Sequence, residues 1–330
     1  MSEFNRRAFL ASAAAALAAS PISNSVAAAP SPVKLTSIKF GSVSWLIETI
    51  RAQGLDKKHD LDLQILEVAT ASAGPVALLA GEADVIVSDW TWALRQRAKG
   101  YDLKFAPYSA ALGSLMVAKD SPFKTLADLK GKKIGVAGTG IDKSWVLLRA
   151  YSRKVLGADI ATIAEPAFGA PPLVTEEFKN GRLDAVLNFW TYAARLAGSG
   201  SRQILSMADV VKALDIDPAP ALVGFIWSEK AVRDKGVPIK KLLAAADDAN
   251  ATLGASDAAW EHLRPLVKPA TEAELGAIKA YYRSGITKGW SSADTASAKK
   301  LTNLLIELGD AELVGDGTRF DPDLFHTTRG

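Results

Sequence analysis

One segment of this chain occurs twice, and the repeat constrains the fold more than any other feature. Residues 81–95 and 181–195 share glycine, aspartate, tryptophan, threonine, alanine and arginine at the same offsets. The chain has eight tryptophans in 330 residues, so two matched Trp-Thr pairs are not expected by chance. We infer two copies of one structural unit.

The length and composition favour two lobes and exclude several kinds of function. A chain of 330 residues is longer than one hydrophobic core usually supports. The formal net charge is +3 and there is no basic run, which argues against nucleic acid as a partner. Cysteine is absent, and the three histidines, His59, His262 and His326, are scattered. We therefore expect no disulfide, no metal site, no cofactor and no enzymatic activity.

Residues 1–29 have the pattern of a twin-arginine signal peptide. Arg6 and Arg7 precede Phe9 and Leu10, an apolar run follows over 11–19, and small residues lead to a cleavage site near 27–29. The apolar run is much shorter than the roughly twenty residues that a membrane-spanning helix needs. This pattern predicts export to a bacterial periplasm.

Short apolar runs alternate with helical patterns through both units, which predicts an α/β protein with mostly parallel sheets. The first unit has predicted strands at 35–40, 61–68 and 85–87 and helices at 45–58 and 72–80. The second has strands at 133–137, near Thr162 and at 185–187, with helices at 144–155 and 175–180. Strand-like runs at 103–108 and 114–119 can connect the first unit to the second, and the run at 222–227 can return the chain to the first unit. The remaining predicted helices are 239–253, 258–267, 272–286 and 293–308.

Ligands of parallel α/β sheets bind beyond the carboxyl ends of the strands, and four loops of this sequence are expected at that position. These are 42–45, 69–74, 88–90 with its duplicate 188–190, and 138–145. The last resembles a phosphate-binding loop, but Lys143 and Ser144 come two residues too late, so no nucleotide is expected. Its helix start can still favour an oxyanion, and Asp142 or Thr139 can equally serve as the helix cap.

The charged and aromatic residues in these loops allow more than one interpretation. A carboxylate from Asp89 or Asp142 in the cleft would require a ligand with a cationic end. Trp90 and Trp190 can contact a ligand, although their duplication favours a structural role. The two copies differ most where Asp89 aligns with Phe189, so specificity is expected there. Two further duplicated residues, Asp84 and Asp184, precede a strand and are interpreted as turn and cap residues.

Three segments, 38–41, 78–85 and 123–136, carry a family resemblance. The last contains Asp-Leu-Lys-Gly-Lys-Lys-Ile-Gly-Val. Together they resemble the NMT1-like periplasmic substrate-binding proteins of ABC importers for nitrate, aliphatic sulfonates and taurine. The resemblance implies the two-lobed type II periplasmic binding protein fold with a ligand cleft between the lobes. Lobe one is then 30–118 plus 222–330, lobe two is 119–221, the chain crosses between them twice, and the C-terminal helices return to lobe one.

The same resemblance implies which residues contact the ligand. In lobe one they are Ser42, Ser44, Trp45, Ser72, Asp89 and Trp90, and in lobe two they are Thr139, Asp142, Ser144, Asn188 and Trp190. The function implied is that of a monomeric receptor that traps a small solute and presents it to a membrane permease. A sulfonate or taurine-like zwitterion is favoured, with its oxyanion at the 139–144 helix start and any amine near Asp89 or Asp142. The alternatives are a cationic or aromatic solute, a metal complex, a sensor, or an enzyme of pyrimidine-precursor synthesis on the same fold.

Overall fold

A computed structural model describes residues 31–38, 41–70, 72–307 and 318–327. The predicted signal peptide and its cleavage site lie outside the described residues, which all belong to one compact unit, Ser31–Gly330. Within the described ranges, no helix is long and apolar enough to span a membrane.

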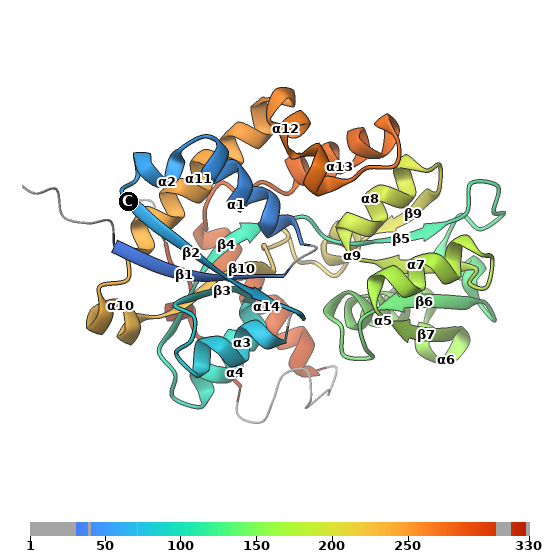
Figure 1. The fold of residues 1–330 in the computed structure, drawn as a ribbon. Helices are drawn as coiled ribbons and strands as arrows, with labels where there is room; N and C mark the ends of the chain where they lie inside the picture. Colours follow the sequence, from blue (N-terminus) through green and yellow to red (C-terminus); the bar gives the residue numbers. More distant parts are fainter. Residues whose placement is uncertain (1–30, 39–40, 71, 308–317, 328–330) are drawn as a thin grey trace, which may run out of the picture. The chain divides into compact units, whose positions relative to one another are not determined.

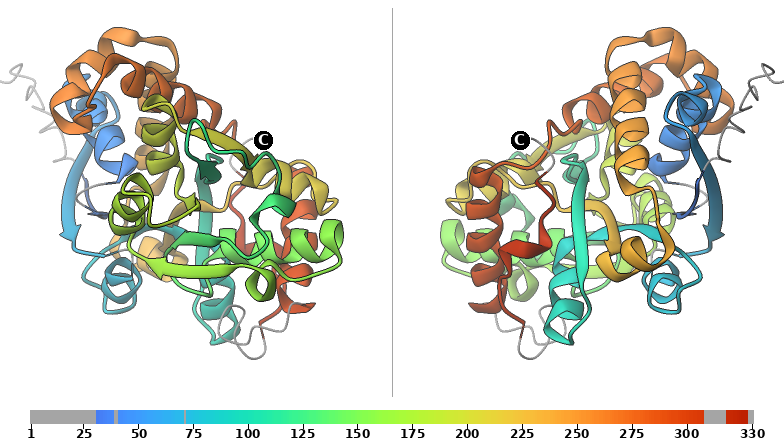
Figure 2. Two further views of the ribbon diagram at one scale, coloured as in Figure 1. Left: turned by 90° about the vertical axis from the view of Figure 1, so that its right-hand side faces the viewer. Right: turned by 90° about the vertical axis from the view of Figure 1, so that its left-hand side faces the viewer.

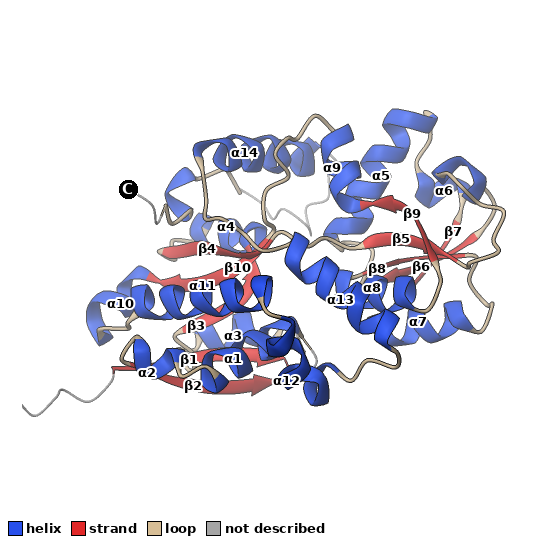
Figure 3. Cartoon of the chain, turned by 90° about the horizontal axis from the view of Figure 1, so that it is seen from above, coloured by secondary structure: helices blue, strands red, loops and turns tan. Residues whose placement is uncertain are grey.

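Two five-stranded sheets form the framework, and they have the same strand arrangement (Figures 1 and 3). The first sheet has the order β2 (Leu61–Val68), β1 (Ser31–Ile38), β3 (Val85–Asp89), β10 (Val223–Ser228), β4 (Leu103–Ser109). The second has the order β7 (Glu165–Gly169), β6 (Lys133–Ala137), β8 (Ala185–Asn188), β5 (Ser114–Val117), β9 (Arg202–Ser206). In each sheet the fourth strand runs antiparallel to its neighbours and comes from the other half of the chain. The predicted duplication of one unit is confirmed, and the fold is a two-lobed α/β fold.

Helices cover both faces of each sheet. Those of the first sheet are α1 (Ser42–Ala52), α2 (Leu55–Lys58), α3 (Ala73–Leu79), α4 (Trp90–Ala98), α10 (Glu229–Lys235), α11 (Ile239–Ala255) and α14 (Ser292–Glu307). On β10, Phe225 belongs to the hydrophobic cluster of α1 and α11, whereas Ile226 belongs to that of α4 and α14. Figure 2 shows α11 and α14 on opposite sides of the strands. This alternation is what a strand buried on both faces requires.

The second sheet is covered in the same way. Its helices are α5 (Lys143–Leu156), α6 (Ile160–Ile163), α7 (Pro171–Lys179), α8 (Trp190–Gly198) and α9 (Met207–Ala213). On β5, Met116 packs in the cluster of α7 and α8, and Leu115 packs in that of α5 and α9. Two short 3-10 helices, Leu126–Leu129 and Pro322–Leu324, complete the described elements together with α12 (Asp257–Val267) and α13 (Glu272–Ser284).

The duplicated aspartates anchor equivalent strands. Asp84 accepts a hydrogen bond from the Lys34 N–H at 2.9 Å, and its own N–H donates to the Lys34 carbonyl at 2.9 Å. Asp184 forms the same pair of bonds with Lys133 at 2.8 and 2.9 Å. Each aspartate therefore ties the turn before one strand to the adjacent strand. These two shared aspartates of the repeat stabilise the scaffold.

Helix α13 makes a close contact with α8, although the C-terminal helices as a group were expected with lobe one. The two helices pack along their length, and Figures 1 and 3 show them side by side. A Cβ on Gly198 of α8 would lie 2.4 Å from the Cα of Glu274 on α13. Helix α12 packs instead on α1 and α11. The segment 257–284 thus connects helices of both sheets.

Two sequence predictions about elements are wrong. The helix predicted over 45–58 is two helices, because Gly54 adopts a left-handed φ of 63° and separates α1 from α2. The strand predicted near Thr162 begins at Glu165, and Thr162 lies in α6. Asp159 starts that short helix by accepting a hydrogen bond from the Ala161 N–H at 3.0 Å.

A methyl group at Gly198 should separate α8 from α13. We expect Gly198→Ala to lower the free energy of unfolding by about 1–3 kcal/mol, since overpacking forces backbone shifts. Gly276→Ala in α13 is the matched control, because its new Cβ would meet no atom within 4 Å. The control should stabilise the protein by up to about 1 kcal/mol through helix propensity. Urea denaturation followed by tryptophan fluorescence measures both, and equal midpoints for Gly198→Ala and wild type would contradict the prediction.

Candidate functional site

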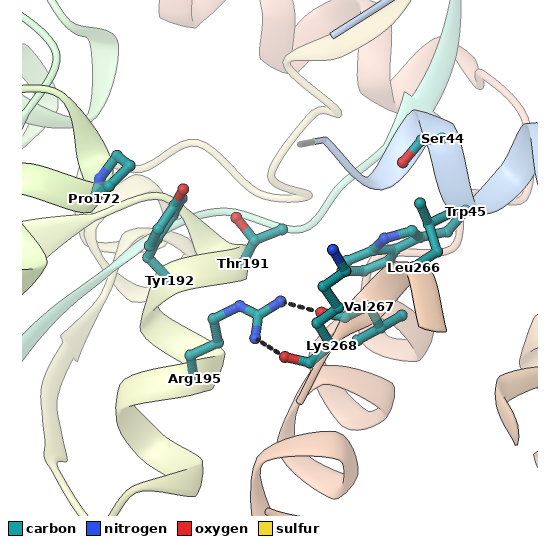
Figure 4. Close-up of a pocket in the computed structure, with 9 residues that line it drawn as sticks. All are labelled: Ser44, Trp45, Pro172, Thr191, Tyr192, Arg195, Leu266, Val267 and Lys268. Carbon is teal, nitrogen blue, oxygen red and sulfur yellow. Dashed lines mark hydrogen bonds between the residues drawn. The ribbon is translucent and has the colours of Figure 1, made fainter. Parts of the chain in front are cut away.

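A pocket of about 370 Å³ lies where α1, α7, α8 and α12 meet (Figure 4). The first turn of α1 contributes Ser44 and Trp45. The start of α7 and the first turns of α8 contribute Pro172, Thr191, Tyr192 and Arg195, and the end of α12 contributes Leu266, Val267 and Lys268. The pocket is therefore formed by elements of both sheets, and its size is suited to a small molecule.

The residues that line this pocket combine an apolar wall with hydroxyl groups and cations. Trp45 and Tyr192 provide rings, Ser44 and Thr191 provide hydroxyls, and Arg195 and Lys268 provide positive charge. Among the described residues that line it, none carries a carboxylate. This combination favours a ligand with an anionic group and an apolar part.

The aromatic wall is held in place by neighbouring rings. Trp45 is 4% exposed and packs edge-on against Trp190 at 5.8 Å and Trp260 at 5.9 Å between ring centroids. Trp190 is half-buried and also meets Tyr282 at 6.1 Å. Because edge-to-face contacts fix ring orientation, Trp45 presents a rigid surface to the pocket.

Arg195 of α8 connects this helix to the end of α12 and to the start of α13. Its guanidinium donates to the Val267 carbonyl at 2.6 Å and to the Lys268 carbonyl at 3.3 Å, as Figure 4 shows. It also forms an ion pair with Glu274, which is buried at the start of α13. The charge of Arg195 is compensated by this carboxylate, so its main role in the pocket is to hold the end of α12.

Asp89 belongs to a separate contact between the two lobes. It caps α4 by accepting from the Trp92 N–H at 2.8 Å and from the Thr91 hydroxyl, and it pairs with Lys143 of α5 at 3.0 Å. Burial would raise the pKa of Asp89, but Lys143 and these hydrogen bonds outweigh burial and lower it below the usual value. The carboxylate is therefore ionised and already has a cationic partner.

Asp142 caps the helix start that was proposed for an oxyanion. Its side chain accepts from the Ser144 N–H at 2.9 Å. Burial raises the pKa of Asp142, with Lys143 and the hydrogen bonds acting against it. Thr139 is exposed in the preceding loop, and Ser144 is half-buried. An oxyanion at this helix start would lie beside the Asp142 carboxylate, which is unfavourable when that group is ionised.

Two more predicted contacts are buried and engaged. Trp90 is 0% exposed, and its indole N–H donates to the Ala221 carbonyl at 3.1 Å. Asn188 is 1% exposed and donates to the Thr175 hydroxyl at 2.8 Å. Trp90 thus links the start of α4 to the segment before β10, and Asn188 links the end of β8 to α7.

The predicted serines have different surroundings. Ser42 is buried and accepts a hydrogen bond from the Tyr108 hydroxyl at 3.1 Å. Burial raises the pKa of Tyr108 to about 12, so its hydroxyl stays protonated. Ser72 is exposed at the start of α3 beside Thr70, and Ser44 donates to the Gly41 carbonyl at 2.6 Å.

Two groups of predicted residues come together in the structure. Ser44 and Trp45 line the pocket and Trp190 contacts Trp45, whereas Asp89 meets the 139–144 segment through Lys143. The sequence reasoning missed the other seven residues of the pocket: Pro172, Thr191, Tyr192, Arg195, Leu266, Val267 and Lys268. Thr191, Tyr192 and Arg195 lie inside the repeat, so the repeat could have indicated them. No sequence pattern indicated the residues at the end of α12.

A family model described as NMT1/THI5 like matches residues 51–255, which is more than half of the chain. The chain belongs to the NMT1/THI5-like family. Among curated proteins, it is 30% identical over 137 residues to a Haemophilus influenzae protein named for a provisional role in thiamine biosynthesis. That match covers 41% of this chain and 42% of the relative, so the chain spans less than half the length of that relative.

Solved structures share the fold of this NMT1/THI5-like chain at low identity. The periplasmic aliphatic sulphonate binding protein SsuA of Escherichia coli has a TM-score of 0.70 at 20% identity, covering 91% of this chain and 94% of that one. The alkanesulfonate-binding protein SsuA of Xanthomonas axonopodis, bound to MOPS, has a TM-score of 0.67 at 18% identity, covering 91% and 99%. At these identities the likeness supports the two-lobed binding-protein fold.

The ion pair between Asp89 and Lys143 should contribute to stability in a pH-dependent way. Asp89→Asn keeps a cap acceptor but removes the charge, and we expect it to cost about 1–2 kcal/mol at pH 7. Because the pKa of Asp89 is lowered by folding, this contribution is present above the unfolded value of about 3.9 and is lost as the pH falls through the folded value.

Asp215→Asn is the matched control for this prediction. Asp215 pairs with Lys154 at 2.6 Å on the surface, where solvent screens the pair, so its loss should cost much less than the loss of Asp89. Urea midpoints between pH 3 and 7 measure both variants. Equal losses for the two variants at pH 7 would show that the contact between the lobes contributes no more than a surface ion pair.

Proposed function

We propose that this protein is the solute-binding component of an importer and traps a small organic anion between its two lobes. The observation that carries the proposal is the pocket lined by Trp45, Tyr192, two hydroxyls and two cations, with contributions from both lobes. A ligand that touches both lobes stabilises the closed arrangement, which is how such a receptor signals that it is loaded.

The favoured ligand is an aliphatic sulfonate. An alkyl chain can lie on Trp45 and Tyr192, while a sulfonate can accept hydrogen bonds from hydroxyl and ammonium groups. The names of the sulfonate-binding structural relatives support this choice. A taurine-like zwitterion is less well accommodated, because Asp89 is paired with Lys143 and Asp142 caps α5. Its amine would have to displace one of these contacts.

The cellular setting follows from the same proposal. We place the mature protein in the periplasm as a monomer, exported by the twin-arginine route, with lobes at 30–118 plus 222–330 and at 119–221. Its closed form would be recognised by the membrane permease of an ABC importer. The shared fold of the sulfonate-binding relatives and the Arg6-Arg7 pattern support this setting.

A second candidate ligand is a nitrogen heterocycle of the kind used in thiamine biosynthesis. The Haemophilus influenzae relative favours it, and the ring of Tyr192 can stack on an aromatic ring. The positive charge of Lys268 argues for the anion, since a neutral or protonated heterocycle gains nothing from it. The two candidates therefore differ in the charge of the ligand.

Isothermal titration of the purified mature protein can separate these candidates. We expect heat of binding with a C4 to C6 alkanesulfonate, weaker binding with taurine and none with a neutral aminopyrimidine. Binding of the aminopyrimidine alone would replace the first candidate with the second. Turnover of either compound during incubation would show an enzyme instead of a receptor.

Tyr192 should contribute to affinity through its ring. We expect Tyr192→Ala to weaken alkanesulfonate binding about tenfold, because the alkyl chain loses an apolar contact surface. Tyr101→Ala is the matched control, since Tyr101 is 45% exposed and lies outside the pocket. Titration calorimetry with one sulfonate measures both variants. An equal affinity for Tyr192→Ala and wild type would remove Tyr192 from the site.

A further inference from the structure

Lys268 differs from the other cation of the pocket in having an available charge. Arg195 is paired with Glu274, whereas in the described part of the chain no carboxylate forms an ion pair with Lys268. The Lys268 side chain is exposed and lines the pocket. In Figure 4 its ammonium group points into the space between Thr191 and Trp45. It is therefore the cation that a ligand can approach.

The backbone of Lys268 is held in a conformation that lysine rarely adopts. It ends α12 with φ 50° and ψ 58°, the left-handed region in which helix ends usually place glycine or asparagine. Its N–H donates to the Arg264 carbonyl at 2.8 Å, which completes the last turn. A non-glycine residue in this conformation costs conformational free energy, and such residues are concentrated at functional sites.

A helix of the second sheet helps to hold the left-handed conformation of Lys268. Arg195 of α8 donates to the carbonyls of Val267 and Lys268, which lie on either side of the Lys268 Cα. Helix α12 itself packs on α1 and α11 of the first sheet. The position of the Lys268 ammonium therefore depends on a contact from the second sheet.

We propose that Lys268 binds the anionic group of the ligand and that Arg195 is its positioning residue, acting from the other lobe. This inference rests on the proposed function and names the residue that gives the site its charge preference. The Thr191 hydroxyl flanks the same space and can donate to a remaining oxygen of the anion, whereas the Ser44 hydroxyl already donates to the Gly41 carbonyl. The anion site is then complete only when α8 and the end of α12 are in contact.

The test compares a charged ligand with a neutral ligand of the same shape. Butanesulfonate and butanesulfonamide are titrated by calorimetry into wild type, Lys268→Met and Lys268→Arg. We expect Lys268→Met to bind the sulfonate about tenfold more weakly, Lys268→Arg to restore most of the affinity, and the weaker sulfonamide binding to change little. The apparent affinity of wild type for the sulfonate should also fall more steeply with salt than that of Lys268→Met.

Lys299→Met is the control for removing a lysine charge, because Lys299 is exposed on α14 and outside the pocket. Equal urea midpoints for both Lys→Met variants show that folding is intact. If wild type binds the sulfonate and Lys268→Met binds it equally well, the role of Lys268 is refuted while the proposed function stands. If wild type binds no sulfonate, the proposed function itself fails.

The positioning role of Arg195 has a separate readout. Arg195→Lys keeps the charge beside Glu274 but cannot reach both carbonyls with a planar fork of donors. We expect it to weaken sulfonate binding several-fold when Lys268 is present and to have no further effect in the Lys268→Met background. Equal effects in both backgrounds would show that Arg195 acts only on the packing of α8.

Discussion

Helix α8 lies so close to α13 that a single methyl group on Gly198 would meet the backbone of Glu274 at 2.4 Å. This contact determines where Arg195, one turn earlier on α8, meets Glu274 and the carbonyls at the end of α12. Because α12 packs on α1, these contacts together bring Trp45 of α1 and Tyr192 of α8 to one pocket. The pocket is thus a consequence of how helices from both sheets approach each other, and a small residue makes that approach possible.

The two copies of the repeat show how one scaffold can serve two roles. Asp84 and Asp184 anchor their strands with the same pair of hydrogen bonds. The copies differ at the next helix: Asp89 caps α4 and pairs with Lys143, while Phe189 at the same position is 40% exposed. The first copy therefore supplies a charged contact between the lobes, whereas the second places an exposed apolar ring before α8. Position 89 acts through its ion pair with Lys143. Phe189 itself does not line the pocket, but the following residues Thr191 and Tyr192 do.

The framework was predictable from the sequence because it depends on local patterns. Apolar runs and glycines locate the strands and helix ends, and duplication implies two equivalent sheets. One strand was predicted too early in the chain, near Thr162, because the Asp159 cap that starts α6 was not recognised. The site was less predictable, since Lys268 reaches the pocket only through the long-range packing of α12 on α1 and through Arg195. No pattern around residue 268 indicates those contacts, and Asp142 was equally compatible with a cap and with a ligand contact.

The most direct test of this account is a crystal structure of the mature protein with a brominated alkanesulfonate, located by the anomalous scattering of bromine. The account predicts a bromine peak against the rings of Trp45 and Tyr192, with sulfonate density at the Lys268 ammonium. Sulfonate density at the start of α5, beside Asp142, with the pocket between α1 and α8 left without ligand, would contradict it.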